Sequence, residues 1–274
     1  MATEDAAVLA RLAAEARIAF EEPLDQQLAP LGRRAIRALA PVAGERILDI
    51  GCGAGQTVLE LAAAVQPGGT VLGVDLSPLV VAAAERRMRS AAGAGVVVGD
   101  VQSYAFAAGG FDAAFSRFGV MFFADPVAAF TNIRRALRPG GRLAFVCWRA
   151  FEENELDYLP LRAAAPHLPS RAMPGLATEA FSFAEPDRVR GLLSYAGFEA
   201  IEIAAHDEAV GSGGLEPMLQ VCLRFGPLGK FLREHPEYTD ALAAPVRAAL
   251  AARDGPGGVR LNAATWIVTA RSDG

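Results

Sequence analysis

The feature that most constrains the fold is a short apolar strand that runs directly into three alternate glycines. The strand spans residues 46–50, the glycines stand at positions 51, 53 and 55, and a helix is predicted over 57–65. Glycine lets the chain turn sharply and lets a ligand approach the backbone without meeting a Cβ atom. The helix adds free N–H groups and the positive end of its dipole. This turn is therefore predicted to bind a ligand, with a plain strand-to-helix turn as the alternative.

From this turn onward, helices and strands alternate along the chain. Helices are expected to begin at Ser77-Pro78 and Asp125-Pro126, where an N-capping side chain precedes a proline in the first helical position. Such alternation predicts a parallel sheet covered by helices on both faces, with ligands at the carboxyl ends of the strands. The predicted strands are 46–50, 70–75, 95–100, 111–116 and 142–148.

The remaining segments are expected to belong to the same domain, 1–274. Apolar residues recur at helical spacing over 1–45, where Pro23, Pro30 and Pro41 punctuate the pattern. Residues 151–184 contain four prolines and little periodicity, and a strand is predicted at 198–204. The expected parts of the domain are N-terminal helices 1–45, a cofactor-binding core 46–150, lid insertions 151–184 and 207–260 over the core, and a last strand 264–270.

The net charge limits the kinds of molecule that the protein is expected to bind, and the cysteine content indicates its cellular compartment. The net charge is −5, from 26 basic and 31 acidic residues, which argues against nucleic acid as the substrate. The three cysteines are scattered, which is typical of a reduced, cytoplasmic protein without structural zinc. Glu4 and Asp5 stand where a signal peptide would carry positive charge, and no apolar run reaches the roughly 18 residues of a membrane span. A cytoplasmic protein without a membrane span is expected.

Three carboxylates stand at the ends of successive predicted strands. Asp49 precedes the glycine turn by two residues, where it would repel a pyrophosphate but favour a cationic amine or a sulfonium. Asp75 is placed to accept hydrogen bonds from ribose hydroxyls, which fits NAD and S-adenosylmethionine equally. Asp100 could accept from the exocyclic amine of adenine while Val101 offers apolar contact. The alternatives are a helix N-terminal charge for Asp75 and a solvated loop acid for Asp100.

Several motifs, in order, resemble those of class I S-adenosylmethionine-dependent methyltransferases. They are ILDIGCGAG at 47–55, GVDLS at 73–77, GDV at 99–101 and LRPGGRL at 137–143. The segment FDAAFSRFGVMFF at 111–123 is similar to the ubiquinone/menaquinone-biosynthesis (type 11) subgroup, and the resemblance covers roughly residues 30–150. It implies a Rossmann-like, doubly wound, mostly parallel seven-stranded α/β sheet with an antiparallel last strand and helical lid insertions.

The resemblance also implies roles for individual residues. Asp49 and the glycine turn would hold the methionine portion of the cofactor. Asp75 would bind the ribose, and Asp100 with Val101 would bind the adenine edge. Leu76 would pack on adenine, and the residues after the fourth strand would line the methyl-transfer channel. The cofactor-binding residues implied are Asp49, Gly51, Cys52, Gly53, Gly55, Asp75, Leu76, Asp100, Val101, Gln102, Ser116, Arg117 and Phe118. The cofactor would be S-adenosyl-L-methionine, and the product S-adenosyl-L-homocysteine.

Methyl transfer from a sulfonium asks mainly for alignment and exclusion of water, so a metal is unnecessary. The histidines are far apart in sequence and lack metal-ligand spacing. A base would help if the acceptor were a hydroxyl or an acidic carbon. His206, after the predicted strand 198–204, is the first candidate, and His167 in the proline-rich insertion is the second. A surface histidine is the alternative reading of each.

Aromatic residues near the predicted ligand edge are candidate contacts for the acceptor, namely Trp148, Tyr158 and Phe122. The two insertions are rich in apolar side chains, which favours a small, partly apolar acceptor methylated at oxygen or carbon, with nitrogen as a further option. The same side chains could instead form core or the contact face of a homodimer.

Two other functions compete with this interpretation. An NAD-dependent oxidoreductase is opposed by the glycine spacing beside Asp49 and by the lack of a Tyr-x-x-x-Lys pair. A non-catalytic module that binds S-adenosylmethionine for regulation is the other alternative, because methyl transfer needs no diagnostic base. The leading hypothesis is a methyltransferase (EC 2.1.1.-) that acts on a small molecule.

Overall fold

The computed structural model describes residues 2–168 and 179–273, and the chain divides into two compact units. The first, here called the sheet unit, contains residues 31–147, 182–206 and 265–274. The second, the helical unit, contains 1–30, 148–181 and 207–264. Placement of the two insertions as lids over a single domain stays a prediction.

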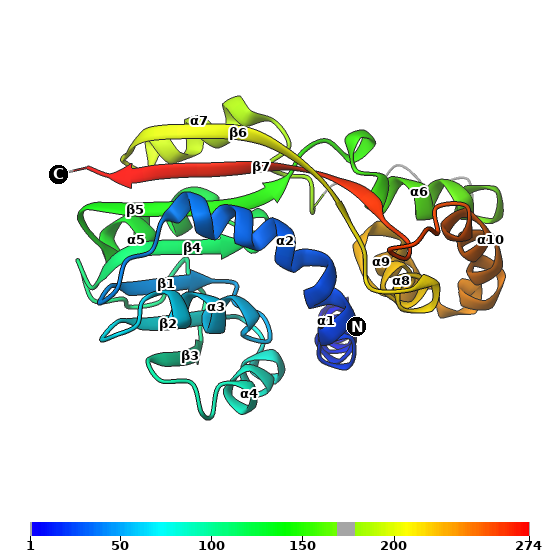
Figure 1. Ribbon diagram of the computed structural model, residues 1–274, viewed down its shortest axis with the longest axis horizontal. Coiled ribbons are helices and arrows are strands. Elements are labelled where there is room, and N and C mark those ends of the chain that lie inside the picture. The colour runs from blue at the N-terminus through cyan, green and yellow to red at the C-terminus, as the bar shows by residue number, and fades with distance from the viewer. Residues whose placement is uncertain (1, 169–178, 274) are drawn as a thin grey trace. The chain divides into compact units, whose positions relative to one another are not determined.

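A seven-stranded sheet with the strand order β3-β2-β1-β4-β5-β7-β6 forms the centre of the sheet unit (Figure 1). Strands β1 to β5 pair in parallel, and β7 runs against its neighbours. This confirms the predicted mostly parallel sheet with an antiparallel last strand. The strands are β1 (Arg46–Ile50), β2 (Thr70–Asp75), β3 (Ala94–Val98), β4 (Phe111–Arg117), β5 (Leu137–Trp148), β6 (Phe198–Val210) and β7 (Leu261–Ser272).

Strand register aligns the sequence motifs at one edge of this sheet. Asp49 of β1 pairs with Gly73 of β2 and with Phe115 of β4. Because the three strands are parallel, their carboxyl ends and the turns that follow them lie at the same edge. We call this the ligand edge.

Two helices of the sheet unit, α4 and α5, begin where the sequence predicts. Ser77 accepts a hydrogen bond from Val80 N–H at 3.4 Å, Asp125 accepts from Ala128 N–H at 2.9 Å, and a proline follows each cap. The cap therefore satisfies one of the free N–H groups of each first turn. The helices are α3 (Gln56–Ala64), α4 (Pro78–Arg87), α5 (Pro126–Ala136) and α7 (Pro186–Tyr195), with a 3-10 turn, η1 (Val120–Phe122). Helix α2 (Glu21–Leu39) belongs to the sheet unit from Leu31 onward and to the helical unit before it.

The core of the sheet unit contains a cluster of phenylalanines. Phe130 of α5 lies 5.9 Å from Phe145 of β5 and 6.1 Å from Phe183, between ring centroids, and all three side chains are fully buried. Each such burial contributes roughly 1.5–3 kcal/mol to folding. Apolar contact therefore holds α5 on the sheet and leaves the ligand edge to polar residues.

The helical unit is built mainly from α1 (Ala2–Ala19), α6 (Glu155–Ala164), α8 (Leu215–Cys222), α9 (Gly226–Glu234) and α10 (Thr239–Ala251), with short 3-10 turns. Buried Asn154 Oδ1 accepts from Ala264 N–H at 2.8 Å, and buried Gln27 donates to Ser212 Oγ at 3.1 Å. Within the described ranges, no helix combines the length and the apolar character needed to cross a membrane.

The prediction that Pro23 and Pro30 interrupt the N-terminal helices is wrong. Helix α2 continues through Pro23 and Pro30. Pro23 stands in the first turn, where its missing N–H has no intrahelical role, and buried side chains such as Leu31 and Leu39 hold the helix beyond Pro30. The insertion 151–184, which was predicted to be helical, contains α6, and this helix continues through Pro160.

Strand boundaries also differ from the predictions. β5 begins at Leu137, five residues earlier than expected, because Leu137 pairs with Phe111 before a register shift that accommodates the Pro-Gly-Gly segment. β3 ends at Val98, so Asp100 follows the strand by two residues. β6 and β7 extend beyond the predicted 198–204 and 264–270, and each carries residues of both units.

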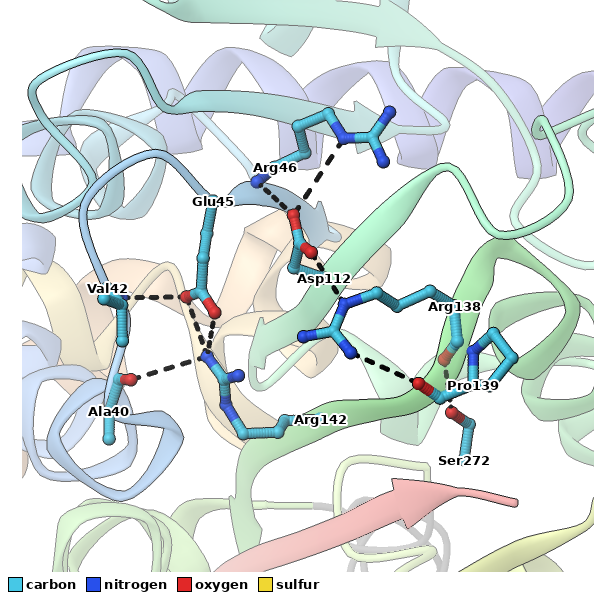
Figure 2. Close-up of polar contacts among 9 residues, drawn as sticks. All are labelled: Ala40, Val42, Glu45, Arg46, Asp112, Arg138, Pro139, Arg142 and Ser272. Atoms are coloured by element: carbon cyan, nitrogen blue, oxygen red, sulfur yellow. Dashed lines mark hydrogen bonds and ion pairs between the residues drawn. The ribbon is translucent and has the colours of Figure 1, made fainter. Parts of the chain in front are cut away.

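The amino-terminal edge of the sheet is fixed by charged side chains (Figure 2). Asp112 accepts from Arg46 N–H at 2.8 Å and from Arg138 Nε at 2.7 Å. Glu45 pairs with Arg142 at 2.7 Å, and Ser272 Oγ donates to the Arg138 carbonyl at 2.7 Å. Burial alone would raise the pKa of Asp112, but hydrogen bonds from Arg46 and Arg138 lower it. This network joins β1, β4, β5 and β7 at the edge opposite the candidate site.

Candidate functional site

Asp49 is a fully buried carboxylate at the end of β1. Its Oδ2 accepts a short hydrogen bond from Thr57 Oγ1 in the first turn of α3, whereas its Oδ1 has no hydrogen-bond partner in residues 2–168 and 179–273. Burial raises the pKa of Asp49 to about 7, against the lowering effects of the Thr57 hydrogen bond and the positive charge of Arg117. A buried acceptor without a donor is unfavourable in the free protein, so Oδ1 is suited to a ligand that brings one.

The turn after β1 packs against the turn after β4. Gly51 has a φ of +66°, and a Cβ there would lie 2.9 Å from Gly119 Cα. Ser116 is fully buried, donates to the Ile50 carbonyl at 2.8 Å and accepts from Gly119 N–H at 3.2 Å. The predicted ligand-facing serine thus joins the turn after β1 to the turn after β4.

Asp75 links the glycine turn to the end of β2. One carboxylate oxygen accepts from Gly53 N–H at 3.0 Å and the other from Ser77 N–H at 3.0 Å. Each oxygen keeps a second lone pair for another donor. Next to it, Leu76 is 67% exposed, which is unusual for leucine and leaves an apolar surface at the ligand edge.

The turn after β3 is organised around Asp100. Gln102 donates to both oxygens of Asp100, from its side chain at 3.0 and 2.9 Å and from its backbone N–H at 2.9 Å. Asn132 of α5 donates to the Val101 carbonyl at 2.7 Å, and Gly99 N–H donates to the Asp75 carbonyl at 3.0 Å. These contacts place the third predicted acid beside the second, although the Gln102 amide occupies much of its hydrogen-bonding capacity.

Cys52 has a packing role. Its side chain is buried, and its Sγ lies 2.8 Å from the position that a Cβ on Gly73 would take. Burial raises the pKa of the thiol, so the neutral form persists. The cysteine therefore fills the space that glycine leaves in β2.

The two residues that follow Ser116 are Arg117, which is held by a hydrogen bond, and Phe118, whose backbone has a positive φ. Arg117 donates a short hydrogen bond to Gln56 Oε1, at the start of α3. Phe118 has a φ of +59°, which is uncommon for a bulky residue, and its N–H donates to the Val146 carbonyl at 3.0 Å. Backbone strain of this kind often marks functional sites.

Of the candidate base and acceptor residues, His206 and Phe122 belong to the sheet unit, and the other three belong to the helical unit. His206 lies within β6 rather than after it, four strand steps from β1, or about 19 Å at the usual strand spacing. His167 is an exposed residue of the helical unit in η3 (Ala165–His167), and Tyr158 belongs to α6. Trp148 is buried at the end of β5, and Phe122 is 58% exposed in η1.

Sequence reasoning missed Thr57, Gln56 and Gly119. Thr57 follows Asp49 by eight residues, a separation that only the folded turn brings within hydrogen-bonding distance. The available signal was a polar pair, Gln56-Thr57, at a helix start that otherwise continues with Val58 and Leu59. Gly119 gave no signal because its partner, Gly51, is distant in sequence.

Together, the fold and the ligand edge define an α/β protein with a cluster of acidic residues and glycine turns beside its first strand. A methyltransferase-domain family model of type 11 matches residues 48–145. Aklanonic acid methyltransferase DauC of Streptomyces sp. (strain C5) is 32% identical over 56% of this chain and 73% of its own length. Nocamycin O-methyltransferase of Saccharothrix syringae is 35% identical over 62% of this chain and 64% of its own.

The solved structures agree in fold. Phosphoethanolamine N-methyltransferase 2 of Haemonchus contortus, in complex with S-adenosyl-L-methionine, has a TM-score of 0.57 and 19% identity, covering 89% of this chain and 53% of that chain. The chain belongs to the S-adenosylmethionine-dependent methyltransferases. The family predicted from the motifs is thereby confirmed, and neither the NAD-dependent oxidoreductase nor the non-catalytic module is favoured.

Proposed function

We propose that the ligand edge of the sheet unit binds S-adenosyl-L-methionine and presents its methyl group to a small, partly apolar acceptor. The observation that carries the proposal is the unpartnered Oδ1 of buried Asp49 beside two glycine turns. The amino acid end of the cofactor supplies an ammonium donor for this oxygen. The residues present therefore fit the cofactor that the family requires.

Each neighbouring residue has a defined task in this proposal. Asp75 accepts from the ribose hydroxyls with the lone pairs that Gly53 and Ser77 leave open. Leu76 packs against the adenine, which would cover its exposed side chain. The 100–102 turn contacts the adenine edge, through Val101 and the oxygens of Asp100 that Gln102 orients.

The protein's contribution to the reaction is alignment rather than activation. When bound, S-adenosyl-L-methionine supplies a methyl group that its sulfonium already activates. Ser116 and Gly119 fix the turn after β4 against Ile50, which keeps the backbone beside the reacting centre in one position. Such positioning is the main source of acceleration where no base is required. Phe122, which is exposed, follows this turn and offers apolar surface to an acceptor.

We propose methylation at oxygen or carbon of a small metabolite. The relatives named for aklanonic acid and as a nocamycin O-methyltransferase support this acceptor class. The net charge of −5 argues against nucleic acid, and three free cysteines fit a reducing, cytoplasmic location. A homodimer stays a proposal that light scattering would test.

Calorimetry tests the cofactor site, and turnover tests the reaction. The purified protein is titrated with S-adenosylhomocysteine and with NAD, and only the former should bind. Transfer of labelled methyl from S-adenosylmethionine is then followed with a panel of phenols, quinones, carboxylic acids and amines. Absence of S-adenosylhomocysteine binding would refute the site. Binding with turnover of amines alone would refute the acceptor class.

A further inference from the structure

Three arginines of the helical unit gather where the end of α1 meets the turn between α8 and α9. Helix α1 packs against α9, and the guanidinium carbon of Arg224 lies over the ring of Phe20, 4.3 Å from its centroid. Phe20 directly follows α1 and its N–H still donates to the Ala16 carbonyl, so Phe20 and Arg17 share one face of the helix. Arg233 of α9 donates a short hydrogen bond to the Arg224 carbonyl. We call Arg17, Arg224 and Arg233 the arginine cluster.

Within residues 2–168 and 179–273, no carboxylate forms an ion pair with the arginine cluster. The Arg224 side chain hydrogen bonds to Gln220 alone, through one guanidinium nitrogen, and the Arg233 side chain to the Arg224 carbonyl alone. The Arg17 side chain is exposed and makes neither a hydrogen bond nor an ion pair in the described chain. A guanidinium carries five N–H donors, so each member of the cluster keeps donors for a ligand.

The charges of the arginine cluster repel one another in the free protein. Burial lowers the pKa of Arg224, and burial is also the main cause that lowers the pKa of Arg233. The adjacent Glu234 raises the pKa of Arg233, whereas the positive charge of Arg17 lowers it, which indicates that the two guanidinium groups are close. Like charges held together in partly buried positions cost free energy, and a bound anion would remove that cost.

We propose that the arginine cluster binds the oxyanion of a small molecule, either a carboxylate or a phosphate group. Guanidinium groups bind both kinds of anion through paired N–H···O hydrogen bonds. The contact with Phe20 and the bond to Gln220 already orient Arg224, so less conformational freedom is lost when an anion binds. The site lies within the helical unit and does not depend on cofactor binding at the ligand edge of the sheet unit.

Magnetic resonance of the arginine Nε–Hε groups tests the site on the whole chain. Sodium phosphate and sodium benzoate are titrated separately at constant ionic strength, with sodium chloride making up the difference. Both anions should give saturable shifts in the wild type. Arg17→Met should weaken their binding about threefold to tenfold, because it removes one exposed, partly screened charge. This variant should fold, since the Arg17 side chain makes no hydrogen bond or ion pair in the described chain.

A matched control is Arg11→Met, which removes the same charge from α1, where Arg11 pairs with Glu15 at 2.7 Å. Arg11 stands six residues before Arg17 and so lies on another face of the helix. Its removal should change the affinity for either anion by less than about twofold at this ionic strength.

Two results would overturn the inference: no saturable binding of either anion to the wild type, or weakening by Arg17→Met no greater than by Arg11→Met. Of the two supporting results, tighter binding of phosphate assigns the site to a phosphate group, and tighter binding of benzoate assigns it to an organic acid. Failure of the wild type to bind S-adenosylhomocysteine would instead refute the proposed function and leave this site unaffected.

Discussion

Replacing Asp49 with asparagine should stabilise the free protein at high pH while it weakens the cofactor site. Burial raises the pKa of Asp49 from 3.8 to about 7. The stability that neutral Asp49 contributes is fully present below the unfolded pKa and is lost as the pH rises through about 7. A shift of this size corresponds to about 4 kcal/mol at pH 8, because each pKa unit corresponds to about 1.36 kcal/mol.

Asparagine has no charge to desolvate, and its carbonyl can still accept from Thr57. Its amide would take the place of the unpartnered Oδ1, where a buried donor without an acceptor costs about 1–3 kcal/mol. Asp49→Asn should therefore unfold in urea with a free energy about 1–3 kcal/mol higher than the wild type at pH 8, and this gain should disappear by pH 4. Affinity for S-adenosylhomocysteine at pH 8 should fall tenfold or more.

Asp112→Asn is a control in which the expected change in stability at pH 8 has the opposite sign, because the pKa of Asp112 is lowered rather than raised. Burial would raise the pKa of Asp112, but hydrogen bonds from Arg46 and Arg138 lower it overall, so its stabilising effect is present at neutral pH and is lost in acid. This variant should be less stable than the wild type at pH 8 and should bind S-adenosylhomocysteine normally. The reasoning about Asp49 fails if Asp49→Asn is no more stable than the wild type at pH 8, or if the difference is independent of pH.

Three further substitutions test separate parts of the site. Asp75→Ala should weaken S-adenosylhomocysteine binding tenfold or more in calorimetry, since hydrogen bonds to a charged group contribute about 1.5–3 kcal/mol, and unchanged affinity would remove the ribose assignment. Gly51→Ala should abolish binding because its φ is +66° and its Cβ would meet Gly119, whereas Gly44→Ala, at a φ of +85° with open space, should bind normally; equal affinities would contradict the packing argument. His206→Gln should keep affinity and turnover within about twofold, because four strand steps separate it from β1, and a hundredfold loss of turnover alone would establish it as a base.

The sequence predicted the cofactor half of the molecule better than the rest. β1 and β2 were placed to the residue because glycine, proline and apolar runs there act through local conformation alone. The capped starts of α4 and α5 followed from the same local chemistry. The start of β5 depends on pairing with a strand that is distant in sequence. There the Pro-Gly-Gly segment predicted a turn, whereas the structure has a bulged strand.

Prediction of the candidate site from the sequence has the same limits. Asp49 and the glycines could be found because they stand next to each other in the chain. The unpartnered Oδ1 of Asp49, and the contact of Gly51 with Gly119, exist only after β1, α3 and β4 have come together. Base and acceptor predictions relied on position after a strand, and the longer β6 and the order of strands move His206 away from β1.

The position of β7 in the sheet determines when the sheet can be completed during synthesis of the chain. β7 lies between β5 and β6, and its Ser272 hydroxyl closes a contact with the Arg138 carbonyl. While the ribosome still holds residues 261–272, β5 has an unpaired edge and β6 has no partner in the sheet. Unpaired strand edges promote association between chains, so the nascent protein is vulnerable to aggregation until residues 261–272 have left the ribosome and β7 has paired.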